Sequence, residues 1–377
     1  MYTDRDDQLN QLLSTSIEWL DITDQDYRLM VSRYRAVGAS LDKYWDASPA
    51  GGEVYPQGSI RLGTITRNIH GNDDIDIDLV ARRDLAKASV TQAGLKEDVG
   101  AGLELFIKEE PEGGPLLGEG KRCWTLQYPG FHVDVLPAVP DEQAGGTGIS
   151  ITDTKVRTWL PSNPIGYTNW FHSVMREEHV ALVEKRMAIA PVPEWSIKTT
   201  LQRTVQALKR HRDIYFTGHL EDRPTSVITT TLAAHAYAGG GSLYDVLRAV
   251  TAAMPGLVEE RNGIYVVSNP VQPKENFADR WRDHPRRAAQ FFEWAEHAAA
   301  DFARLGETRG VETVLEKMAL AFGERPAEHA QRVAGAGLFE SRRAGRLAMA
   351  TSTGTLAATG TRPVRGHSFH GPGRARP

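Results

Sequence analysis

The chain of 377 residues is 41% hydrophobic and carries a formal net charge of −4, so its bulk charge argues neither for nor against nucleic-acid binding, and its length predicts two packed lobes and a tail. A single cysteine, Cys123, excludes an intramolecular disulfide framework and a cysteine-rich zinc site. Neither an apolar signal core near the start nor a run of about eighteen apolar residues is visible, which favours a cytoplasmic protein.

Two amphipathic helices are predicted over residues 5–47. Apolar residues recur there at helical spacing in two successive stripes. Polar residues around Asp21 and Asp24 interrupt the pattern and separate the two helices. We expect both helices to form a scaffold behind the sheet that follows.

A Gly-Ser pair, Gly58 and Ser59, marks a sharp turn. It follows an apolar pair and precedes Ile60, which predicts that the chain turns there and enters a short helix. A glycine lets the backbone approach a phosphate closely, and the serine hydroxyl supplies one more donor to a triphosphate. A Gly-Ser pair alone is not a specific signal. Its position shortly before the aspartates described next makes a phosphate-binding turn a reasonable prediction.

Residues 75–79 alternate strictly between apolar residues and aspartates, as in a half-buried strand. Asp76 and Asp78 therefore share one face. Two carboxylates so placed can hold a pair of divalent cations, which can clamp the attacking and leaving oxygens of a phosphoryl displacement. Asp73 and Asp74 fall in a plausible hairpin turn, where they are either solvated acids or part of the site.

The chain between this strand and the next acidic one contains a helix and a hairpin. Residues 81–107 show helical spacing and are predicted to cross one face of the sheet. Residues 109–120, rich in glycine and proline, are expected to form a loop. Residues 121–130 then lead as a strand into a turn at Pro129 and Gly130.

A third aspartate, Asp134, is predicted on that next strand. Residues 131–136 alternate in the same way, and Pro137 is expected to end the strand. Like Asp76 and Asp78, this aspartate replaces an apolar residue in a strand otherwise suited to burial. The three carboxylates can therefore meet across neighbouring strands.

Long helices are predicted from residue 195 onward. Apolar residues from Ile197 to Leu208 recur at steps of three and four, and Lys209 falls on an adjacent stripe. A further helix opens near Ser226 and is closed by three glycines. Ser226 is there either an ordinary N-cap or an anion-binding hydroxyl at a helix N-terminus.

The C-terminal part comprises a helix over residues 284–303, with a buried stripe of alanines and phenylalanines, and a basic tail. The tail, residues 341–377, has seven arginines, no lysine and no acid. We expect it to be mobile. It is either a solubilising segment or a segment captured by a partner.

Several of these motifs together resemble the polymerase-beta-type nucleotidyltransferase core. They are GS at 58–59, DID at 76–78 and HVDVLPA at 132–138. The surrounding residues resemble its bacterial CD-NTase branch, the cGAS/DncV-like synthases that make cyclic di- and trinucleotide signals in anti-phage defence. Further matches, spread over most of residues 50–305, are QGSIRLGT, SNPIGYTNWF, LKRHRD, TSVITTTLA and NPVQPKENFADRW.

The resemblance implies an α+β fold with two lobes. One lobe is a polymerase-beta-like nucleotidyltransferase sheet with helices, and the other, C-terminal lobe is mostly helical. We expect the catalytic core, with the N-terminal helices, at residues 1–180 and the helical nucleotide-binding lobe at 181–310. A C-terminal extension with the flexible basic tail is expected at 311–377.

The resemblance also implies an activity, the synthesis of a cyclic di- or oligonucleotide from ribonucleoside triphosphates such as ATP and GTP, with release of pyrophosphate. Our hypothesis is that two Mg²⁺ ions, or Mn²⁺ in their place, sit on Asp76, Asp78 and Asp134. The donor triphosphate would be bound by Gly58, Ser59, Lys209 and Ser226, of which the resemblance assigns Lys209 and Ser226. In this interpretation the product is a second messenger of CBASS defence, nucleic acid is not required, and an accessory regulatory protein can bind the tail.

Two other functions stay open. A template-independent nucleotidyltransferase acting on RNA or protein would share the aspartates. A catalytically silent nucleic-acid sensor would keep the fold, although intact metal ligands and the lack of a basic stripe with interleaved aromatics count against it. Labelled triphosphates distinguish the first alternative, and binding of duplex DNA distinguishes the second.

Overall fold

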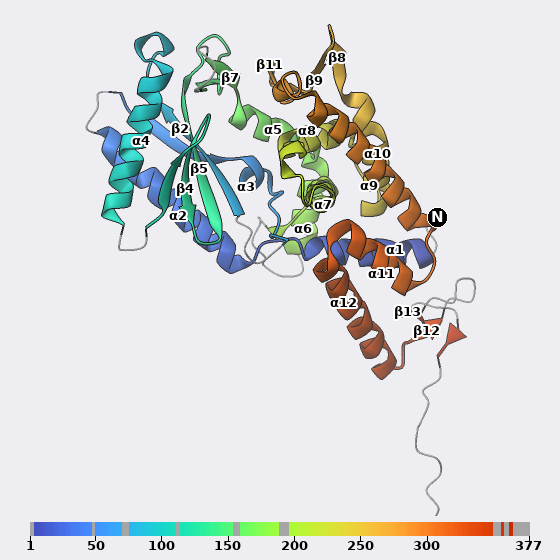
Figure 1. The fold of residues 1–377 in the computed structure, drawn as a ribbon. Coiled ribbons are helices and arrows are strands. Elements are labelled where there is room, and N and C mark those ends of the chain that lie inside the picture. The colour runs from blue at the N-terminus through green and yellow to red at the C-terminus, as the bar shows by residue number, and fades with distance from the viewer. Residues whose placement is uncertain are drawn as a thin grey trace, which may run out of the picture. The chain divides into compact units, whose positions relative to one another are not determined.

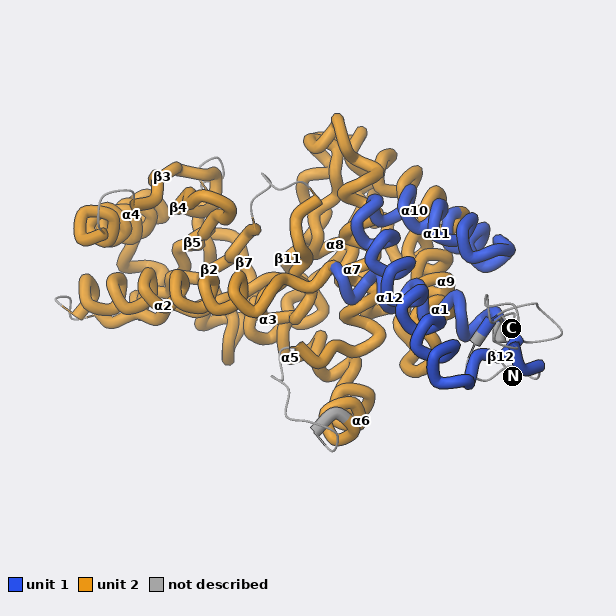
Figure 2. Tube along the Cα trace, turned by 90° about the horizontal axis from the view of Figure 1, so that it is seen from below, with its two compact units in different colours: residues 1–19, 301–377 blue, residues 20–300 orange. Residues whose placement is uncertain are grey.

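The computed structural model describes residues 4–46, 50–69, 75–110, 114–153, 159–187, 196–349, 356–357 and 362–364. The chain divides into two compact units, residues 20–300 and residues 1–19 with 301–377 (Figure 2). The domain limits expected at residues 180 and 310 stay a prediction.

A mixed sheet forms the first part of the larger unit (Figure 1). Its main path runs β1-β2-β5-β4-β3, while β6 pairs with β5 and β7 with β6. The pair β2 and β5 is parallel and the others are antiparallel. The strands are β1 (Gly52–Gln57), β2 (Ile75–Arg83), β3 (Leu116–Glu119), β4 (Trp124–Tyr128), β5 (Phe131–Pro140), β6 (Ile149–Ile151) and β7 (Leu160–Ser162).

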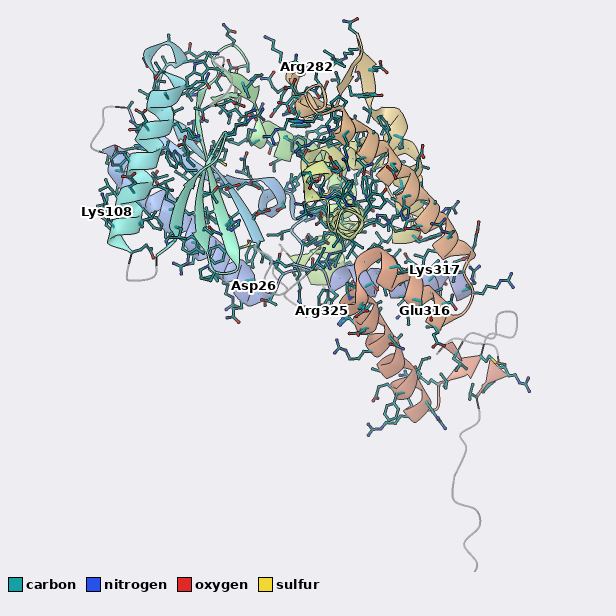
Figure 3. The ribbon with its side chains drawn as sticks, in the orientation of Figure 1. Asp26, Lys108, Arg282, Glu316, Lys317 and Arg325 are labelled. Atoms are coloured by element: carbon teal, nitrogen blue, oxygen red, sulfur yellow. The ribbon has the colours of Figure 1, made fainter. Side chains whose placement is uncertain are left out.

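The two faces of this sheet have different roles. Ile77 of β2 and Val133 of β5 point to one face, where helices α2 (Asp24–Asp46) and α4 (Gln92–Glu109) complete a buried apolar core. Lys108, on the outer side of α4, points away from the sheet (Figure 3). Because strand side chains alternate, the aspartates of β2 and β5 point to the opposite face.

Proline at position 137 does not end β5, contrary to expectation. The strand continues to Pro140, with β4 as its partner up to Val135 and β6 from Ala138 onward. On this edge of β5, Pro137 lies in the gap between β4 and β6, where a residue without an N–H donor is tolerated, while on the other edge it lies opposite Ala81 of β2.

Two other expectations for the sheet need correction. Residues 116–119, expected in a loop, form β3 at the edge of the sheet. The helix expected over 81–107 begins only at Gln92, because residues 81–83 continue β2 and η1 (Lys87–Ser89) precedes the helix. The hairpin of β4 and β5 around Gly130 is confirmed.

The rest of the larger unit is mainly helical. α7 begins with a capping box between Thr199 and Gln202, and the predicted stripe that includes Leu201 and Leu208 is buried. The elements are α3 (Gly58–Leu62), α5 (Pro164–Val174), α6 (Arg176–Met187), α7 (Thr200–Tyr215), η3 (Leu220–Asp222), α8 (Ser226–Ala236), α9 (Leu243–Ala253), η4 (Met254–Leu257), β8 (Glu259–Arg261), β9 (Ile264–Val266), β10 (Ser268–Asn269), β11 (Gln272–Asn276), η5 (Asp279–Trp281) and α10 (Pro285–Glu307), within which the boundary between the units falls.

The smaller unit contains α1 (Asp4–Glu18), α11 (Val311–Phe322) and α12 (Glu324–Arg343). The apolar stripe of α1 is buried, and its Ser16 Oγ donates to the Pro326 carbonyl oxygen of α12 at 3.2 Å. The expectation that both N-terminal helices back the sheet is therefore wrong for α1, whose partners are α11 and α12, while α2 takes that role. Arg325, near the start of α12, is exposed (Figure 3).

The expected basic tail is described only in part. Its first residues complete α12, and three short strands follow, namely β12 (Ala348–Met349), β13 (Leu356–Ala357) and β14 (Arg362–Pro363). The other tail residues lie outside the described part of the chain. Among the described residues, no helix combines the length and apolar character needed to cross a bilayer.

Candidate active site

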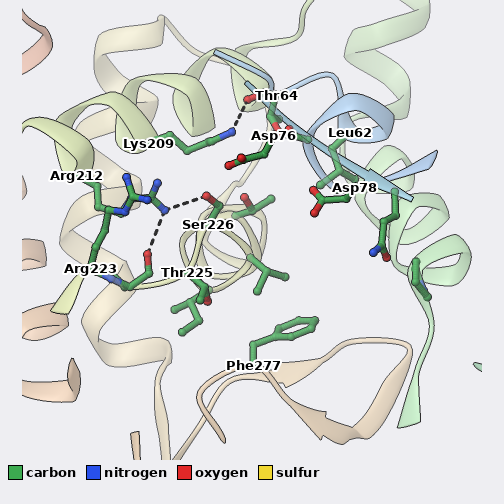
Figure 4. A pocket seen from close by; sticks show the side chains of 18 of the residues that line it. Leu62, Thr64, Asp76, Asp78, Lys209, Arg212, Arg223, Thr225, Ser226 and Phe277 are labelled. Atoms are coloured by element: carbon green, nitrogen blue, oxygen red, sulfur yellow. Dashed lines mark hydrogen bonds between the residues drawn. The ribbon is translucent and has the colours of Figure 1, made fainter. Parts of the chain in front are cut away.

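A cleft with a volume of about 1180 Å³ opens within the larger unit, between the end of the sheet and helices α7 and α8 (Figure 4). This volume exceeds the ~300–1,000 Å³ typical of a site for one drug-sized ligand. Its lining includes six of the seven residues predicted from the sequence, namely Gly58, Ser59, Asp76, Asp78, Lys209 and Ser226.

The seventh predicted residue, Asp134, lies beside Asp78. The parallel register of β2 and β5 pairs these two residues directly and places Asp76 opposite His132. Thr125 of β4, the cross-strand partner of Asp134, donates from its hydroxyl to Asp134 Oδ1 at 2.5 Å. The sheet thus places the carboxylates of Asp76, Asp78 and Asp134 on one face. We call these three residues the acid wall. Residues 71–74, with Asp73 and Asp74, lie outside the described residues.

Negative charge on the acid wall is energetically unfavourable, and the pKa values of two of its carboxyl groups are raised. Burial in the cleft, then the charges of Asp76 and Asp134, raise the pKa of Asp78 to about 7. The pKa of Asp76 is also raised, first by loss of bulk water and then by Asp134. Although 74% of the Asp76 side-chain surface is accessible, the cleft walls displace much of the surrounding solvent.

Few protein groups neutralise the acid wall. The Nδ1 atom of His132 lies 4.0 Å from Asp76 Oδ1. Within the described part of the chain, no lysine or arginine forms an ion pair with any of the three aspartates. Clustered carboxylate oxygens without a cationic partner are the ligand set that hard divalent cations such as Mg²⁺ prefer. The residue types of the acid wall therefore suit a divalent cation, although the oxygen atoms of its three carboxylates do not all lie within 4.8 Å of one another.

The Gly58–Ser59 turn lies against the acid wall. As predicted, the chain leaves β1 there and enters the short helix α3. Gly58 has a φ of +64°, and a Cβ atom on it would overlap the Asp78 carboxylate. Glycine is therefore required on two grounds, backbone conformation and the close approach of Asp78.

Lys209 faces the acid wall from α7. Its side chain is buried, and its Nζ donates to the Thr64 carbonyl oxygen at 3.0 Å (Figure 4). Burial, then the charge of Arg212, lower its pKa to about 8. A buried ammonium with a lowered pKa gains stability from an incoming anion, so Lys209 suits a phosphate.

Ser226 is held by an arginine that sequence reasoning missed. Arg212 Nη1 donates to Ser226 Oγ at 2.9 Å and to the Pro224 carbonyl oxygen at 3.1 Å (Figure 4). Ser226 is the first residue of α8 and not its N-cap, which is Thr225. We call Lys209, Arg212 and Ser226 the basic wall. The spacing of Lys209 and Arg212, three residues apart on one helix, could have indicated Arg212.

The side of the cleft away from the basic wall carries an aromatic group, Phe277 (Figure 4). Its ring packs edge-on against Tyr167 with centroids 5.7 Å apart. Nearby Glu275 accepts hydrogen bonds from Ser162 Oγ at 2.8 Å and Asn269 Nδ2 at 2.7 Å. The runs SNPIGYTNWF and NPVQPKENFADRW contain these residues, but no role was predicted for any of them, because they meet only through the packing of β7, α5 and β11.

Comparison with known proteins identifies the family. No protein-family model matches the chain. Its sequence is, however, 30% identical over 327 residues to the c-di-GMP synthase of Roseivirga ehrenbergii, and the match covers 85% of either chain. The chain belongs to the bacterial CD-NTase family. This CD-NTase is a nucleotidyltransferase and a cyclic-oligonucleotide synthase, as the sequence predicted.

Solved structures share the fold of this CD-NTase. The Bradyrhizobium diazoefficiens CD-NTase CdnG in complex with GTP matches with a TM-score of 0.68 and 21% identity, over 87% of this chain and 99% of that one. The Vibrio cholerae DncV cyclic AMP-GMP synthase, in complex with a linear intermediate, matches with a TM-score of 0.60 and 13% identity, over 82% and 94%. The predicted α+β nucleotidyltransferase fold is confirmed.

Proposed function

We propose that the cleft joins ribonucleoside triphosphates, GTP among them, into a cyclic dinucleotide and expels pyrophosphate at each transfer. The observation that carries the proposal is the meeting of the acid wall and the basic wall across one cleft. The cleft volume of about 1180 Å³ supports simultaneous binding of a donor and an acceptor. GTP is favoured as a substrate because the Roseivirga relative is a c-di-GMP synthase.

The acid wall would hold two divalent cations, Mg²⁺ or Mn²⁺. When bound, these ions would polarise the α-phosphate and lower the pKa of the attacking ribose hydroxyl. The bond between Thr125 and Asp134 orients one carboxylate oxygen and leaves the other for an ion or a proton. We assign Asp134 as the acceptor of the hydroxyl proton.

The basic wall and the glycine turn would hold the donor triphosphate. Gly58 lets the backbone come close, Ser59 and Ser226 offer hydroxyl donors, and Lys209 offers an ammonium. In-line attack forms a bond between the acceptor oxygen and the α-phosphorus and breaks the bond from the α-phosphorus to the pyrophosphate oxygen. A second transfer within the linear product closes the ring.

Incubation of the full chain with all four ribonucleoside triphosphates and Mg²⁺ tests the proposal. We expect pyrophosphate release and a small, phosphatase-resistant product that contains guanine, identified by mass spectrometry, without added DNA. Chelation of the metal should abolish both signals. The Asp76→Ala, Asp78→Ala double variant is the matched control. Label found only on added RNA or protein would instead favour a polymer-modifying nucleotidyltransferase.

We further propose that the product acts as a second messenger in anti-phage defence in the cytoplasm, with an accessory protein able to bind the C-terminal tail. Resemblance to the family supports this role. Phage titres on cells that carry the gene with its neighbouring genes test it. Protection should be lost with the Asp76→Ala, Asp78→Ala variant, and equal titres for the two strains would count against the role.

A further inference from the structure

A row of polar side chains on α7 is buried against the backbone that follows α3. Gln202, Gln206, Lys209 and Arg210 lie at steps of four, three and one, which places them on one side of the helix. Their exposed fractions are 6%, 0%, 8% and 2%. Burial of such groups is unfavourable unless they are hydrogen-bonded, so their partners indicate what the row does.

Each of the four side chains donates to a main-chain carbonyl oxygen within residues 62–67. The bonds are Gln202 Nε2 to Leu62 at 2.9 Å, Lys209 Nζ to Thr64 at 3.0 Å, Gln206 Nε2 to Ile65 at 2.8 Å and Arg210 Nη2 to Arg67 at 2.5 Å. We call Gln202, Gln206 and Arg210 the α7 clamp.

The clamp fits its target closely. Gly63 has a φ of +67°, and a Cβ atom there would overlap the side-chain nitrogen of Gln202. Gln206 also donates to Asp21 Oδ1 at 2.9 Å and accepts from Arg203 Nη1 at 3.1 Å, so both ends of its amide are satisfied. Fully satisfied buried networks of this kind fix one arrangement of the groups they join.

Residues 62–67 continue directly from the glycine turn. The Thr64 amide donates to the Ser59 carbonyl oxygen at 2.9 Å, and Thr64 and Ile65 line the cleft. The ammonium of Lys209 has three hydrogens, and its bond to Thr64 uses one of them. The segment that the clamp holds therefore links Ser59 to Lys209 through Thr64.

We propose that Gln202, Gln206 and Arg210 are positioning residues for the donor triphosphate. They hold the glycine turn against α7 so that Ser59 and Lys209 face a common phosphate position before the nucleotide arrives. Nucleotide binding then requires no ordering of residues 58–67. The affinity is higher, because no conformational entropy of this segment is lost on binding. The inference rests on the proposed function of the cleft.

Two variants that remove clamp donors test the inference, Gln206→Met and Arg210→Met. Loss of one such bond should raise the dissociation constant of a non-hydrolysable GTP analogue, and KM, about tenfold. The value of kcat should stay within about threefold, because the acid wall is unchanged. Arg210→Lys, which keeps a donor for the Arg67 carbonyl oxygen, should restore most of the affinity.

Arg5→Met is the matched control, since Arg5 Nη2 donates to the Thr308 carbonyl oxygen at 2.8 Å within the smaller unit. We expect this variant to lower thermal stability and to leave analogue affinity unchanged. Wild-type affinity for the analogue in folded Gln206→Met and Arg210→Met would overturn the inference. Failure of the wild-type protein to bind any triphosphate analogue would instead count against the proposed function.

Hydrogen exchange on the wild-type protein tests the same inference without any variant, and so remains informative if the clamp variants do not fold. The amides of Thr64 and Arg67 donate to the carbonyl oxygens of Ser59 and Leu20. A preformed segment predicts protection of both amides without nucleotide, and a change below about tenfold on addition of the analogue. Rapid exchange without nucleotide, followed by protection with it, would contradict preorganisation by the clamp.

Discussion

The acid wall and the basic wall of the cleft show opposite pKa shifts for the same physical reason. Burial raises the pKa of Asp78 to about 7 and lowers the pKa of Lys209 to about 8. In both cases the charged form loses hydration without gaining a full partner. A complex of divalent cations and a triphosphate would supply each wall with the charge it lacks.

The two walls differ in how their groups are held. On the acid wall, Asp134 has the Thr125 hydroxyl as a partner, and Asp78 depends on the register of its strand. On the basic wall, Lys209 and Arg212 donate to main-chain oxygens of neighbouring segments. The acid wall thus concentrates charge, while the basic wall is preorganised by hydrogen bonds. Substitutions should therefore act on chemistry at one wall and on affinity at the other.

The largest effect is expected for Asp78→Asn, which should act in opposite directions on catalysis and stability. Loss of a metal ligand should lower kcat on the order of a thousandfold, from several kcal/mol of lost transition-state stabilisation. In metal-free protein the same change should raise the free energy of unfolding at pH 8 by about 1–3 kcal/mol. A fully buried carboxyl with the same rise in pKa would change the free energy of unfolding by ~4 kcal/mol. The value expected for Asp78 is smaller, because its partial exposure screens the charge.

The sign of the stability change follows from the raised pKa of Asp78. Ionisation of this carboxyl costs stability, and the cost is absent below the ordinary pKa of 3.8, grows as pH rises, and is complete above about 7. Chemical unfolding at pH 4 and pH 8 with a chelator measures it. A stabilisation by Asp78→Asn of equal size at both pH values would argue against a charge effect.

The next effect concerns Lys209 and the pH dependence of nucleotide binding. With a pKa of about 8 in the free protein, Lys209 loses its charge above pH 8. Affinity for a non-hydrolysable triphosphate should then fall by up to about tenfold per pH unit, as expected for one coupled proton. Lys209→Arg should flatten this decline, because arginine stays charged. Calorimetric titration of the wild-type protein and the Lys209→Arg variant from pH 7 to pH 9 measures this difference. Parallel plots of affinity against pH would exclude Lys209 as the titrating group.

The two walls also differ in how much of them the sequence predicted. The acid wall follows from local alternation, because a strand with aspartates at every second position must place them on one face, and Asp76 and Asp78 meet this condition. The basic wall needs the packing of α7 on α8. Arg212 reaches Ser226, fourteen positions away, and no local periodicity encodes that contact.

The errors of prediction have the same origin. Pro137 would end an ordinary strand, but β5 changes partners at that position, which only the sheet topology reveals. The apolar stripe on α1 correctly indicated burial. It could not identify the helices that cover it, α11 and α12, because they lie some 300 residues away in the sequence. Local pattern determines which face is buried, while the partner depends on tertiary packing.

A smaller effect is expected for Arg212→Lys. Lysine keeps a charge but cannot reproduce the fork that joins Ser226, the Pro224 carbonyl and Asp213. We expect about a tenfold rise in KM with little change in kcat, because the loss falls on the preorganised wall. Steady-state kinetics measure both constants. A fall in kcat at unchanged KM would show that the two walls do not divide chemistry and affinity in this way.

The smallest effect is expected for Thr125→Val, which removes the hydroxyl that donates to the Asp134 carboxylate and nearly preserves side-chain shape. One net hydrogen bond contributes about 0.5–1.5 kcal/mol, which corresponds to a two- to tenfold loss. Because Thr125 orients an acid-wall carboxylate, the loss should fall on kcat, with KM for GTP unchanged. Thr125→Ser, which keeps the hydroxyl, should retain most of kcat. If both variants raised KM alone, Asp134 would belong to binding, and the contrast between the walls would have to be redrawn.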